Sequence, residues 1–443
     1  MGASKWARGF FCSILFLFLG IKQAGAGGYY FYGFGDRAAS LGYSFIGLAD
    51  DATAIYWNPA GLTQLHQKQI RGGFWQMIQY NYKDRNHVSN TNINRLAQDM
   101  DPRRGDFLTA IYPEEPNYFR DDEMGTPLAL MQDIEAAWQW KGYHFGAGFY
   151  TPLGTASSWQ DRNRLPSQSL IDGRLWGNFF LAINNISVAK EILPGLSIGS
   201  GFNFLWGKMG QDGHKAFLDP DNPGRNYGYD YEAKGWGWGV EGVFGVLYQM
   251  SPQLQVGAVY RTGGTLKFTG ENEERHTLLQ IADKADFRWR LLNPPTWGIG
   301  IAFRPHPRLL IVADWQREDW TRARYNFNQH NHRSSRSFLL QDMDMDLNWH
   351  AIDDFRVGVE YKVAENFFLR AGHGWYPSPL PQDQAGIFTL SPVENVPTIT
   401  AGFSYSTPGG WMFDFHLENH YEPEHNNTTH ACIAYGFGIS KRF

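Results

Sequence analysis

The sequence predicts an all-β chain: a transmembrane antiparallel β-barrel of about 14 strands whose lumen is plugged by an N-terminal hatch. Three observations support this fold class. Apolar and polar residues alternate with a period of two from about residue 68 onward, short turns alternate with long polar connections, and the last strand ends in an aromatic residue, Phe443. The expected domains are a signal peptide over 1–26, the hatch over 27–67 and the outer-membrane β-barrel over 68–443.

The start of the chain has the features of a secretory signal peptide. Lys5 and Arg8 provide positive charge, residues 10–20 form a short apolar run, and the small residues 24–26 offer a cleavage site. The apolar run is short for a membrane-spanning helix. The remaining sequence has no long apolar stretch, and the mean hydropathy of −0.42 is that of a polar chain. We therefore expect export and exclude a helical inner-membrane protein.

The composition is consistent with a barrel and gives no sign of other chemistry. Aromatic residues make up 16% of the chain and there are 49 glycines, as expected where aromatic girdles face lipid and backbones crowd. A formal net charge of −5 gives no reason to propose nucleic acid as a partner. Of the two cysteines, Cys12 falls in the signal peptide, which leaves Cys432 without an internal disulfide partner. We expect no cofactor and a monomer.

Strand segments are recognised by their alternation. In 355–363, five apolar residues oppose Arg356, Glu360 and Lys362 together with a glycine. The segments 197–206 and 296–303 alternate in the same way, with glycines on the less apolar face. A soluble β-sandwich also alternates, but its apolar face fills a closed core, whereas in a barrel that face contacts lipid.

The connections between these segments favour the barrel. Short turns occur at 141–142, 193–195, 251–253, 305–307, 364–366 and 407–410. Long polar segments lie near 83–127, 152–173, 208–235, 268–285, 321–346 and 377–396. Outer-membrane barrels have short periplasmic turns and long extracellular loops, so counting through this pattern gives about 14 strands with both ends in the periplasm.

The final segment predicts how the barrel closes. Ile433, Tyr435 and Phe437 alternate with small residues up to Phe443, an ending that resembles the C-terminal assembly signal of outer-membrane barrels, although Lys441 departs from an apolar pattern. An open sheet edge in lipid would leave backbone groups unsatisfied. We therefore expect the last strand to pair with the first, in the bacterial outer membrane.

Residues 27–67 do not alternate like barrel strands. They are rich in aromatic residues and in glycines such as Gly33, Gly35, Gly42 and Gly47. So large an apolar segment is costly to expose to water, and the lumen is the nearest place to bury it. The sequence therefore predicts a hatch inside the barrel.

This N-terminal segment carries a motif that resembles a known family. The run 37–42 followed by 49–62, which ends in Asn58-Pro59-Ala60, is similar to the N-terminal signature of the FadL/TodX family, and 368–372 with 378–381 extends the likeness. The resemblance implies an outer-membrane transporter of long-chain fatty acids or aromatic hydrocarbons. It also implies a 14-stranded barrel with a luminal hatch and a lateral exit at a kinked strand.

Candidate ligand contacts follow from the hatch and from the resemblance. The expected ligand-binding residues are apolar side chains of the hatch and one cation on the wall that could pair with a carboxylate: Phe31, Phe34, Phe45, Ile55, Trp57 and Arg370. The hatch motif Asn58, Pro59 and Ala60 contributes to the ligand route in the family. The same three residues also suit a turn that only holds the hatch in shape, because proline fixes φ and asparagine bonds nearby backbone.

The other chemical signals in the sequence are weak. His330 and His332 are spaced like metal ligands but have no third ligand, so solvated histidines are the better interpretation and we expect no metal. No serine or cysteine has the histidine context of a nucleophile, so we expect no enzyme.

The predicted function is passive uptake of hydrophobic small molecules, with the ligand and the outer-membrane lipid as partners. No motif for an energy source is present, so flow should follow the concentration gradient. The alternative is a barrel that serves secretion or outer-membrane assembly. The sequence does not decide between a fatty acid and an uncharged hydrocarbon.

Overall fold

The structure is a computed structural model of the 443-residue chain. It describes residues 33–87, 119–124, 128–161, 170–218, 226–276, 281–334, 340, 342–379, 381, 396–425 and 428–443. The predicted signal peptide and Phe31 lie outside the described residues.

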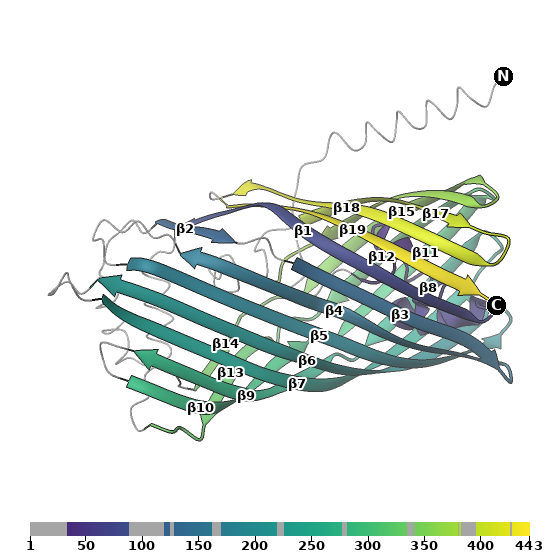
Figure 1. The fold of residues 1–443 in the computed structure, drawn as a ribbon. Coiled ribbons are helices and arrows are strands. Elements are labelled where there is room, and N and C mark those ends of the chain that lie inside the picture. The colour runs from purple at the N-terminus through teal and green to yellow at the C-terminus, as the bar shows by residue number, and fades with distance from the viewer. Residues whose placement is uncertain are drawn as a thin grey trace.

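The described chain is dominated by one antiparallel sheet that closes on itself (Figure 1). Its segments are β1 (Gln69–His87), β2 (Phe119–Met124), β3 (Leu128–Trp140), β4 (Tyr143–Asp161), β5 (Leu170–Leu193), β6 (Leu196–Leu218), β7 (Asn226–Gln249), β8 (Leu254–Arg261), β9 (Gly264–His276), β10 (Ile281–Asn293), β11 (Thr296–His306), β12 (Leu309–Glu318), β13 (Arg324–His330), β14 (Met343–Asp346), β15 (Ile352–Ala364), β16 (Phe367–Tyr376), β17 (Val396–Ser406), β18 (Trp411–His425) and β19 (Thr428–Arg442).

Several consecutive segments continue one barrel strand across a short interruption. β8 and β9 both pair with β7, along two successive stretches. The same relation joins β2 to β3, β10 to β11, β12 to β13, and β14 to β15. Nineteen segments with five such continuations make fourteen barrel strands, which confirms the predicted strand number.

Four of the interruptions lie in four neighbouring strands of the wall. They occur at 262–263, 294–295, 319–323 and 347–351, and we call this line of breaks the crease. Trp320 and Trp349 pack against each other there, with ring centroids 5.4 Å apart, and the backbone N–H of Leu347 donates to the carbonyl of Ala323. The crease is therefore packed and hydrogen-bonded rather than open.

The last strand closes the barrel on the first, as the sequence predicts. β1 and β19 are paired from Gln69 opposite Arg442 to Asp84 opposite Thr428. The wall thus has no free edge along this seam, which satisfies the backbone groups that lipid cannot.

The outer face is apolar because the alternation of the strands directs large side chains outward. On β11, Ile299, Ile301 and Phe303 are exposed whereas Gly298 and Gly300 are buried. The same alternation exposes Phe355 and Val357 on β15. A surface of this kind is stable only in contact with lipid.

Strand pairing extends further than the sequence suggested. The stretch 208–235, expected as a long connection, contains the paired ends of β6 and β7, which stay in register up to Leu218 opposite Asn226. The expected connection 268–285 similarly contains parts of β9 and β10. The strand ends are polar on their outer face. They therefore lack the alternation of apolar and polar residues from which lipid-facing strands are predicted.

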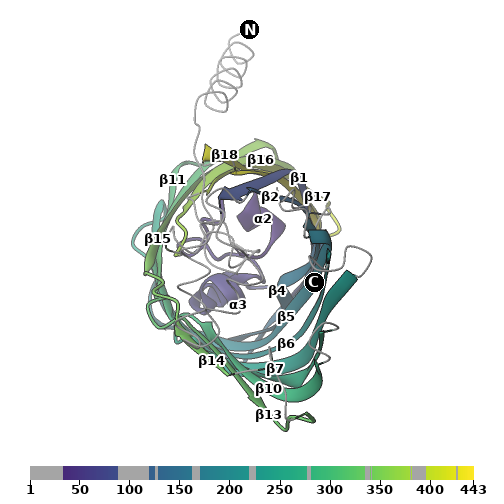
Figure 2. The same ribbon diagram turned by 90° about the vertical axis from the view of Figure 1, so that its left-hand side faces the viewer.

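The hatch lies inside the barrel (Figure 2). It consists of α2 (Asp36–Ala39), α3 (Ala54–Trp57) and the 3-10 helix η1 (Pro59–Gln64), joined by turns. η1 begins where the sequence favours it, because the Asn58 side chain accepts from the N–H of Ala60 and Pro59 occupies the first helical position. No helix in the described ranges is long and apolar enough to cross a membrane.

The two ends of the barrel differ. The C-terminus and the purple hatch lie toward one end in Figure 1, where short turns such as Lys141-Gly142 and Pro194-Gly195 join the strands. The far ends of β6, β7, β9 and β10 lie at the other end. By the rule that periplasmic turns are short, the hatch end faces the periplasm.

Candidate functional site

The hatch backbone is held by side chains of the barrel wall. The Asp314 carboxylate on β12 accepts from the N–H groups of Phe45 and Ile46 at 2.6 and 2.7 Å. The Gln255 amide on β8 donates to the carbonyl of Gly47 at 2.7 Å. These are buried polar bonds that the hatch needs, because its turns leave backbone groups without partners of their own.

Glycines of the wall let the hatch come close to the strands. A Cβ on Gly300 would overlap the backbone N–H of Gly47, and a Cβ on Gly372 would overlap that of Gly42. Further strands present glycines to the hatch in the same way, and together these residues form what we call the glycine ring: Gly146, Gly199, Gly245, Gly257, Gly300, Gly358, Gly372, Gly402 and Gly436. The hatch therefore packs tightly against the wall at this level, through its backbone at some of these glycines and through its side chains at the others.

Buried charges fix the first hatch helix. Asp36 forms ion pairs with Arg71 of β1 and, at 3.0 Å, with Nδ1 of His416 on β18. Arg71 also reaches Glu135 at 3.0 Å. Removing one partner of such a buried ion pair strongly destabilises the folded protein, because the other charge stays buried and unpaired.

A second network fixes the cation of the hatch. Arg37 pairs with Asp50 and with Glu360 of β15, whose Oε2 lies 3.1 Å away. Burial lowers the pKa of Arg37, but the neighbouring Asp50 and Glu360 carboxylates outweigh burial, and the pKa lies well above its ordinary value. The guanidinium is therefore charged, and in this structure both carboxylates contact it.

Arg370, expected to meet a ligand carboxylate, belongs to this network. Its Nε donates to Glu360 at 2.6 Å, and its Nη1 lies 3.6 Å from Asp414 and donates to the Ser404 hydroxyl. The side chain is 2% exposed. In this structure its donors are directed at the wall, and a ligand carboxylate would have to displace an existing partner.

The apolar residues expected to bind ligand come together in the hatch core. Phe34, Phe45, Ile55 and Trp57 are all buried in one hydrophobic cluster. Trp57 Nε1 donates to the carbonyl of Phe34 at 2.8 Å, which ties the start of the hatch to α3. These four side chains hold the hatch together, and Phe34 also reaches the wall.

The contact of Phe34 with the wall is aromatic. Its ring lies 4.6 Å from that of Tyr150 on β4 and 4.9 Å from that of Tyr56, and the two tyrosine rings are 5.5 Å apart. Edge-to-face packing of this kind stabilises a defined arrangement. The hatch thus presents an aromatic surface to β4.

The hatch motif is engaged in structural bonds. Asn58 donates to the carbonyls of Ile46 and Val246 at 3.1 and 3.0 Å, and its side-chain oxygen accepts from Ala60. Pro59 and Ala60 pack on Gly199 of β6. The turn interpretation of the motif therefore accounts for every polar atom of the Asn58 side chain.

A group of luminal aromatic residues that the sequence did not reveal lies beyond the hatch, toward the end with the long connections. Five inward-facing aromatic residues of β5, β9, β10 and β13 pack in a chain of ring contacts between 4.6 and 6.4 Å. We call them the luminal aromatic cluster: Phe179, Phe268, Phe287, Trp289 and Phe327. They belong to or pack against the same hydrophobic cluster as the hatch core. Four of the five fall in stretches that were expected to be loops or lie next to them, which is why they were missed.

The strand ladder is broken beside this cluster. On β4, Tyr150 pairs with Asp133 of β3, but pairing resumes only at Thr155 opposite Ala129. Pro152, which has no N–H, lies in the gap. The Thr151 hydroxyl bridges the gap instead, accepting from the N–H of Gln132 at 2.8 Å.

The break and the luminal aromatic cluster are neighbours. Leu153 pairs with Leu181 of β5, which is fully buried. A Cβ on Gly207 of β6 would lie 3.5 Å from Leu181 Cα and 3.4 Å from the Phe268 ring. One cluster of buried apolar side chains therefore extends from the luminal aromatic cluster through Leu181 to Tyr150, beside the break, and to the hatch core.

The fold is similar to several solved outer-membrane transporters. The Ralstonia pickettii toluene transporter TbuX is 17% identical, with a TM-score of 0.63, covering 93% of this chain and 99% of that one. The P. putida toluene transporter TodX is 15% identical, with a TM-score of 0.67 and coverage of 93% and 99%. A Pseudomonas aeruginosa FadL homologue is 15% identical, with a TM-score of 0.65 and coverage of 92% and 97%. At these identities the likeness establishes the fold.

The sequence comparison establishes the family. No curated protein sequence matches the chain significantly. The model of a family described as outer membrane protein transport protein (OMPP1/FadL/TodX) matches residues 18–419. This match confirms the resemblance inferred from the N-terminal motif and the outer-membrane location. The chain belongs to the outer membrane protein transport family (OMPP1/FadL/TodX).

Proposed function

We propose that the barrel carries uncharged hydrophobic small molecules, with monoaromatic hydrocarbons as the preferred class, passively across the outer membrane. The observation that supports this most directly is the buried apolar cluster that joins the luminal aromatic cluster to the hatch core and to Tyr150, beside the break in β4. An apolar solute that contacts these side chains is removed from water, which is favourable because its apolar area is buried. Binding of this kind is reversible and needs no energy source. The net direction of transport therefore follows the concentration gradient of the solute.

The expected affinity is modest and suits transport. A compact aromatic molecule that buries about 200 Å² gains roughly 5 kcal/mol, which corresponds to a Kd on the order of 10⁻⁴ M. Aromatic side chains add stacking contacts with a flat ring. Binding of this strength captures solute and still releases it.

The charges around the hatch favour a neutral ligand. Arg37, Arg71 and Arg370 are each paired with wall or hatch carboxylates. Arg356 is likewise paired with Asp354 at 3.0 Å. A fatty-acid carboxylate would compete with existing partners for any of these four cations, whereas a hydrocarbon would not. The names of two similar solved structures, both toluene transporters, agree with this choice.

We propose that the ligand leaves sideways through the break at Thr151 and Pro152. Exit toward the periplasm would require the hatch to release its bonds to Asp314, Gln255 and Arg71. Sideways exit requires only that the bridge from Thr151 to Gln132 opens. The sideways route therefore disturbs far fewer buried polar contacts.

A binding experiment tests the proposed ligand and its site. The detergent-purified protein is titrated with a fluorescent apolar probe, and unlabelled toluene or a long-chain fatty acid is added as competitor. Trp289→Ala in the luminal aromatic cluster should weaken displacement by toluene about tenfold, because an aromatic contact and buried area are lost.

The matched control is Trp297→Ala on the outer face of β11, which should leave displacement unchanged. Equal effects of the two variants would contradict the luminal site. Displacement by the fatty acid alone would contradict the proposed ligand class, and absence of saturable probe binding would favour a secretion or assembly role.

A further inference from the structure

We propose that the outer face of the barrel binds a phosphate-bearing lipid headgroup of the outer leaflet. The site is a basic patch formed by four exposed cationic side chains on neighbouring strands, namely Lys208 of β6, Lys267 of β9, and Arg288 and Arg290 of β10. Figure 1 shows β6, β7, β9 and β10 running side by side toward the extracellular end. This site faces lipid and is separate from the transport route in the lumen.

The alternation of the strands directs these four side chains outward. On β9, Leu266 and Phe268 are buried toward the lumen, whereas Lys267 between them is exposed. On β10, Phe287 is buried and Arg288 and Arg290 are exposed. The basic patch and the luminal aromatic cluster therefore occupy opposite faces of the same strands.

The register places like charges opposite each other. Lys267 and Arg290 are direct partners across the β9–β10 ladder. Like charges in directly opposed positions destabilise a sheet. An anion bound between the two cations would remove this repulsion. With the anion bound, the Lys267–Arg290 pair stabilises the complex instead of destabilising the sheet.

Three nearby acidic groups are already engaged with other residues, and Asp212 lies further along β6 on the same face. Glu271 pairs with Lys284 at 2.6 Å, and Asp286 accepts from the Asn331 amide at 2.6 Å. Glu232 pairs with Lys234. Among the residues that the structure describes, the four cations of the basic patch form no ion pair. The patch therefore carries uncompensated positive charge.

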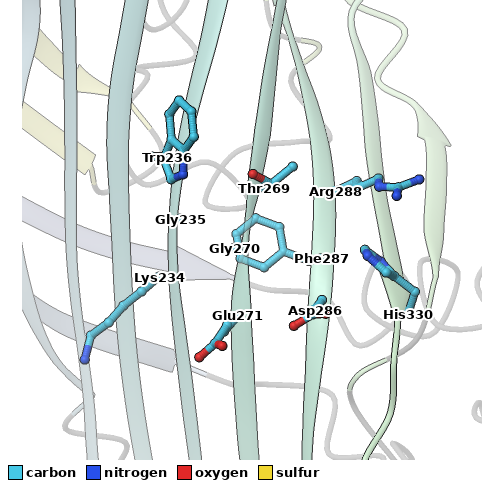
Figure 3. Close-up of a pocket in the computed structure, with 10 residues that line it drawn as sticks. All are labelled: Lys234, Gly235, Trp236, Thr269, Gly270, Glu271, Asp286, Phe287, Arg288 and His330. Carbon is cyan, nitrogen blue, oxygen red and sulfur yellow. The ribbon is translucent and has the colours of Figure 1, made fainter.

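A shallow pocket of about 520 Å³ opens at the edge of the patch (Figure 3). Arg288, Trp236 and Lys234 line it together with polar groups of β9, β10 and β13. The lining also includes Gly235 and Gly270, and the Phe287 ring packs against the luminal side of both.

Tryptophans fix the height of the patch in the membrane. Trp238 is the direct partner of Lys267 across the β7–β9 ladder, and Trp236 is the partner of Lys208 across β6–β7. Trp236 and Trp238 are 57% and 44% exposed. Outward tryptophans mark the interface between hydrocarbon and headgroups. Cations beside them meet lipid phosphates rather than free anions in bulk water.

The test measures lipid binding to the intact protein. Wild type and the double variant Lys267→Gln/Arg290→Gln are purified in detergent, and binding of diphosphorylated lipid A is measured by native mass spectrometry. The variant should bind about tenfold or more weakly, because two phosphate-facing charges are lost. Lys267→Arg/Arg290→Lys should retain binding.

Three controls distinguish the source of the anion and the cause of the loss. Lys141→Gln/Lys190→Gln, with the same charge change at the periplasmic end, should bind like wild type. Dephosphorylated lipid A should bind weakly to all forms, and inorganic phosphate should not compete at the same concentration. The proposal is overturned if the control variant loses binding equally, if phosphorylation of the lipid makes no difference, or if inorganic phosphate displaces the lipid.

Stability provides a second readout. In lipid-free detergent the Lys267→Gln/Arg290→Gln variant should unfold no earlier than wild type, because a repulsive pair is removed. Added lipid A should raise the unfolding temperature of wild type more than that of the variant. A variant that is less stable without lipid and equally stabilised by it would contradict a binding role.

Discussion

At the scale of single residues, Asp314 has an unusual role for a barrel side chain. It lies on a strand that faces lipid on one side, yet its carboxylate replaces the missing hydrogen-bond partners of the hatch turn at Phe45 and Ile46. Hydrogen bonds to a charged acceptor contribute more than neutral ones. One side chain of the wall therefore determines where a loop of the hatch lies.

Replacing Asp314 should loosen that loop. Asp314→Ala removes two charge-assisted hydrogen bonds and leaves buried N–H groups unpaired, at a cost of roughly 3 kcal/mol. Hydrogen exchange of the amides at 45–47 should become about a hundredfold faster. Asp353→Ala, which removes a half-exposed carboxylate on the outer face, is the control and should leave these amides protected. Unchanged exchange in Asp314→Ala would show that packing alone holds the loop.

The sequence allowed structural roles of single residues to be predicted where the chemistry is local. Asn58-Pro59-Ala60 behaves as the turn its residue types favour. Phe34, Phe45, Ile55 and Trp57, predicted as ligand contacts, lie in the buried core of the hatch, and their role in ligand binding stays a prediction. The partners of Arg370 could not be read from sequence, since Glu360, Ser404 and Asp414 come from three other strand segments.

At the scale of elements, β4 combines a regular strand with a local break. The pairing with β3 fails over a few residues, and a threonine hydroxyl replaces the missing ladder bond. A proline in this position removes a donor and prevents the ladder from closing. The break is therefore encoded in the residue types of β4 itself.

Closing this break should block transport. Thr151→Val/Pro152→Ala restores a backbone N–H and removes the hydroxyl bridge, so the ladder can continue. Uptake of labelled toluene by cells that express this variant should fall toward the level of cells without the protein. Pro252→Ala, in the exposed turn before β8, is the matched control and should leave uptake unchanged. Normal uptake with a closed ladder would exclude the sideways route.

Elements were predictable from sequence only within the membrane. The alternation that identifies strands arises from one face in lipid and one in the lumen. From the level of Trp236 and Trp238 outward, the outer face of β6, β7, β9 and β10 becomes polar, and the pattern resembles that of a loop. The luminal aromatic cluster lies in the same part of the wall, so it could not be recognised without the strand register.

At the scale of the whole molecule, the hatch and the wall form one packed unit. The glycine ring reaches the hatch from many strands, and buried ion pairs join α2 to β1 and β18. At some ring positions, such as Gly300 and Gly372, the hatch backbone lies directly on the wall, and at others, such as Gly146, a hatch side chain fills the space. Transport that required the hatch to withdraw would have to break these contacts together.

A disulfide between hatch and wall tests whether the hatch moves out. Thr63 of η1 donates to the Ser197 hydroxyl of β6 at 2.8 Å, so Thr63→Cys/Ser197→Cys places two sulfurs within bonding reach. In a Cys432→Ser background, the oxidised protein should transport toluene as fast as the reduced one, because the proposed exit leaves the hatch in place.

The single-cysteine variants control for the substitutions themselves and should be insensitive to oxidation. Uptake that stops on oxidation and returns with reductant would contradict sideways exit and indicate release toward the periplasm.

The crease in the wall has a consequence for how the mouth of the barrel is shaped. In a closed barrel, strand number and stagger together set the diameter along the whole axis. Interruptions in four neighbouring strands relax that constraint on one side, and Figure 2 shows β10 and β13 displaced outward from the round outline. The cross-section at the extracellular mouth is therefore independent of the cross-section that grips the hatch. Sequence changes in the strands beyond the crease can therefore widen or narrow the entrance for solutes without changing how the glycine ring fits the hatch.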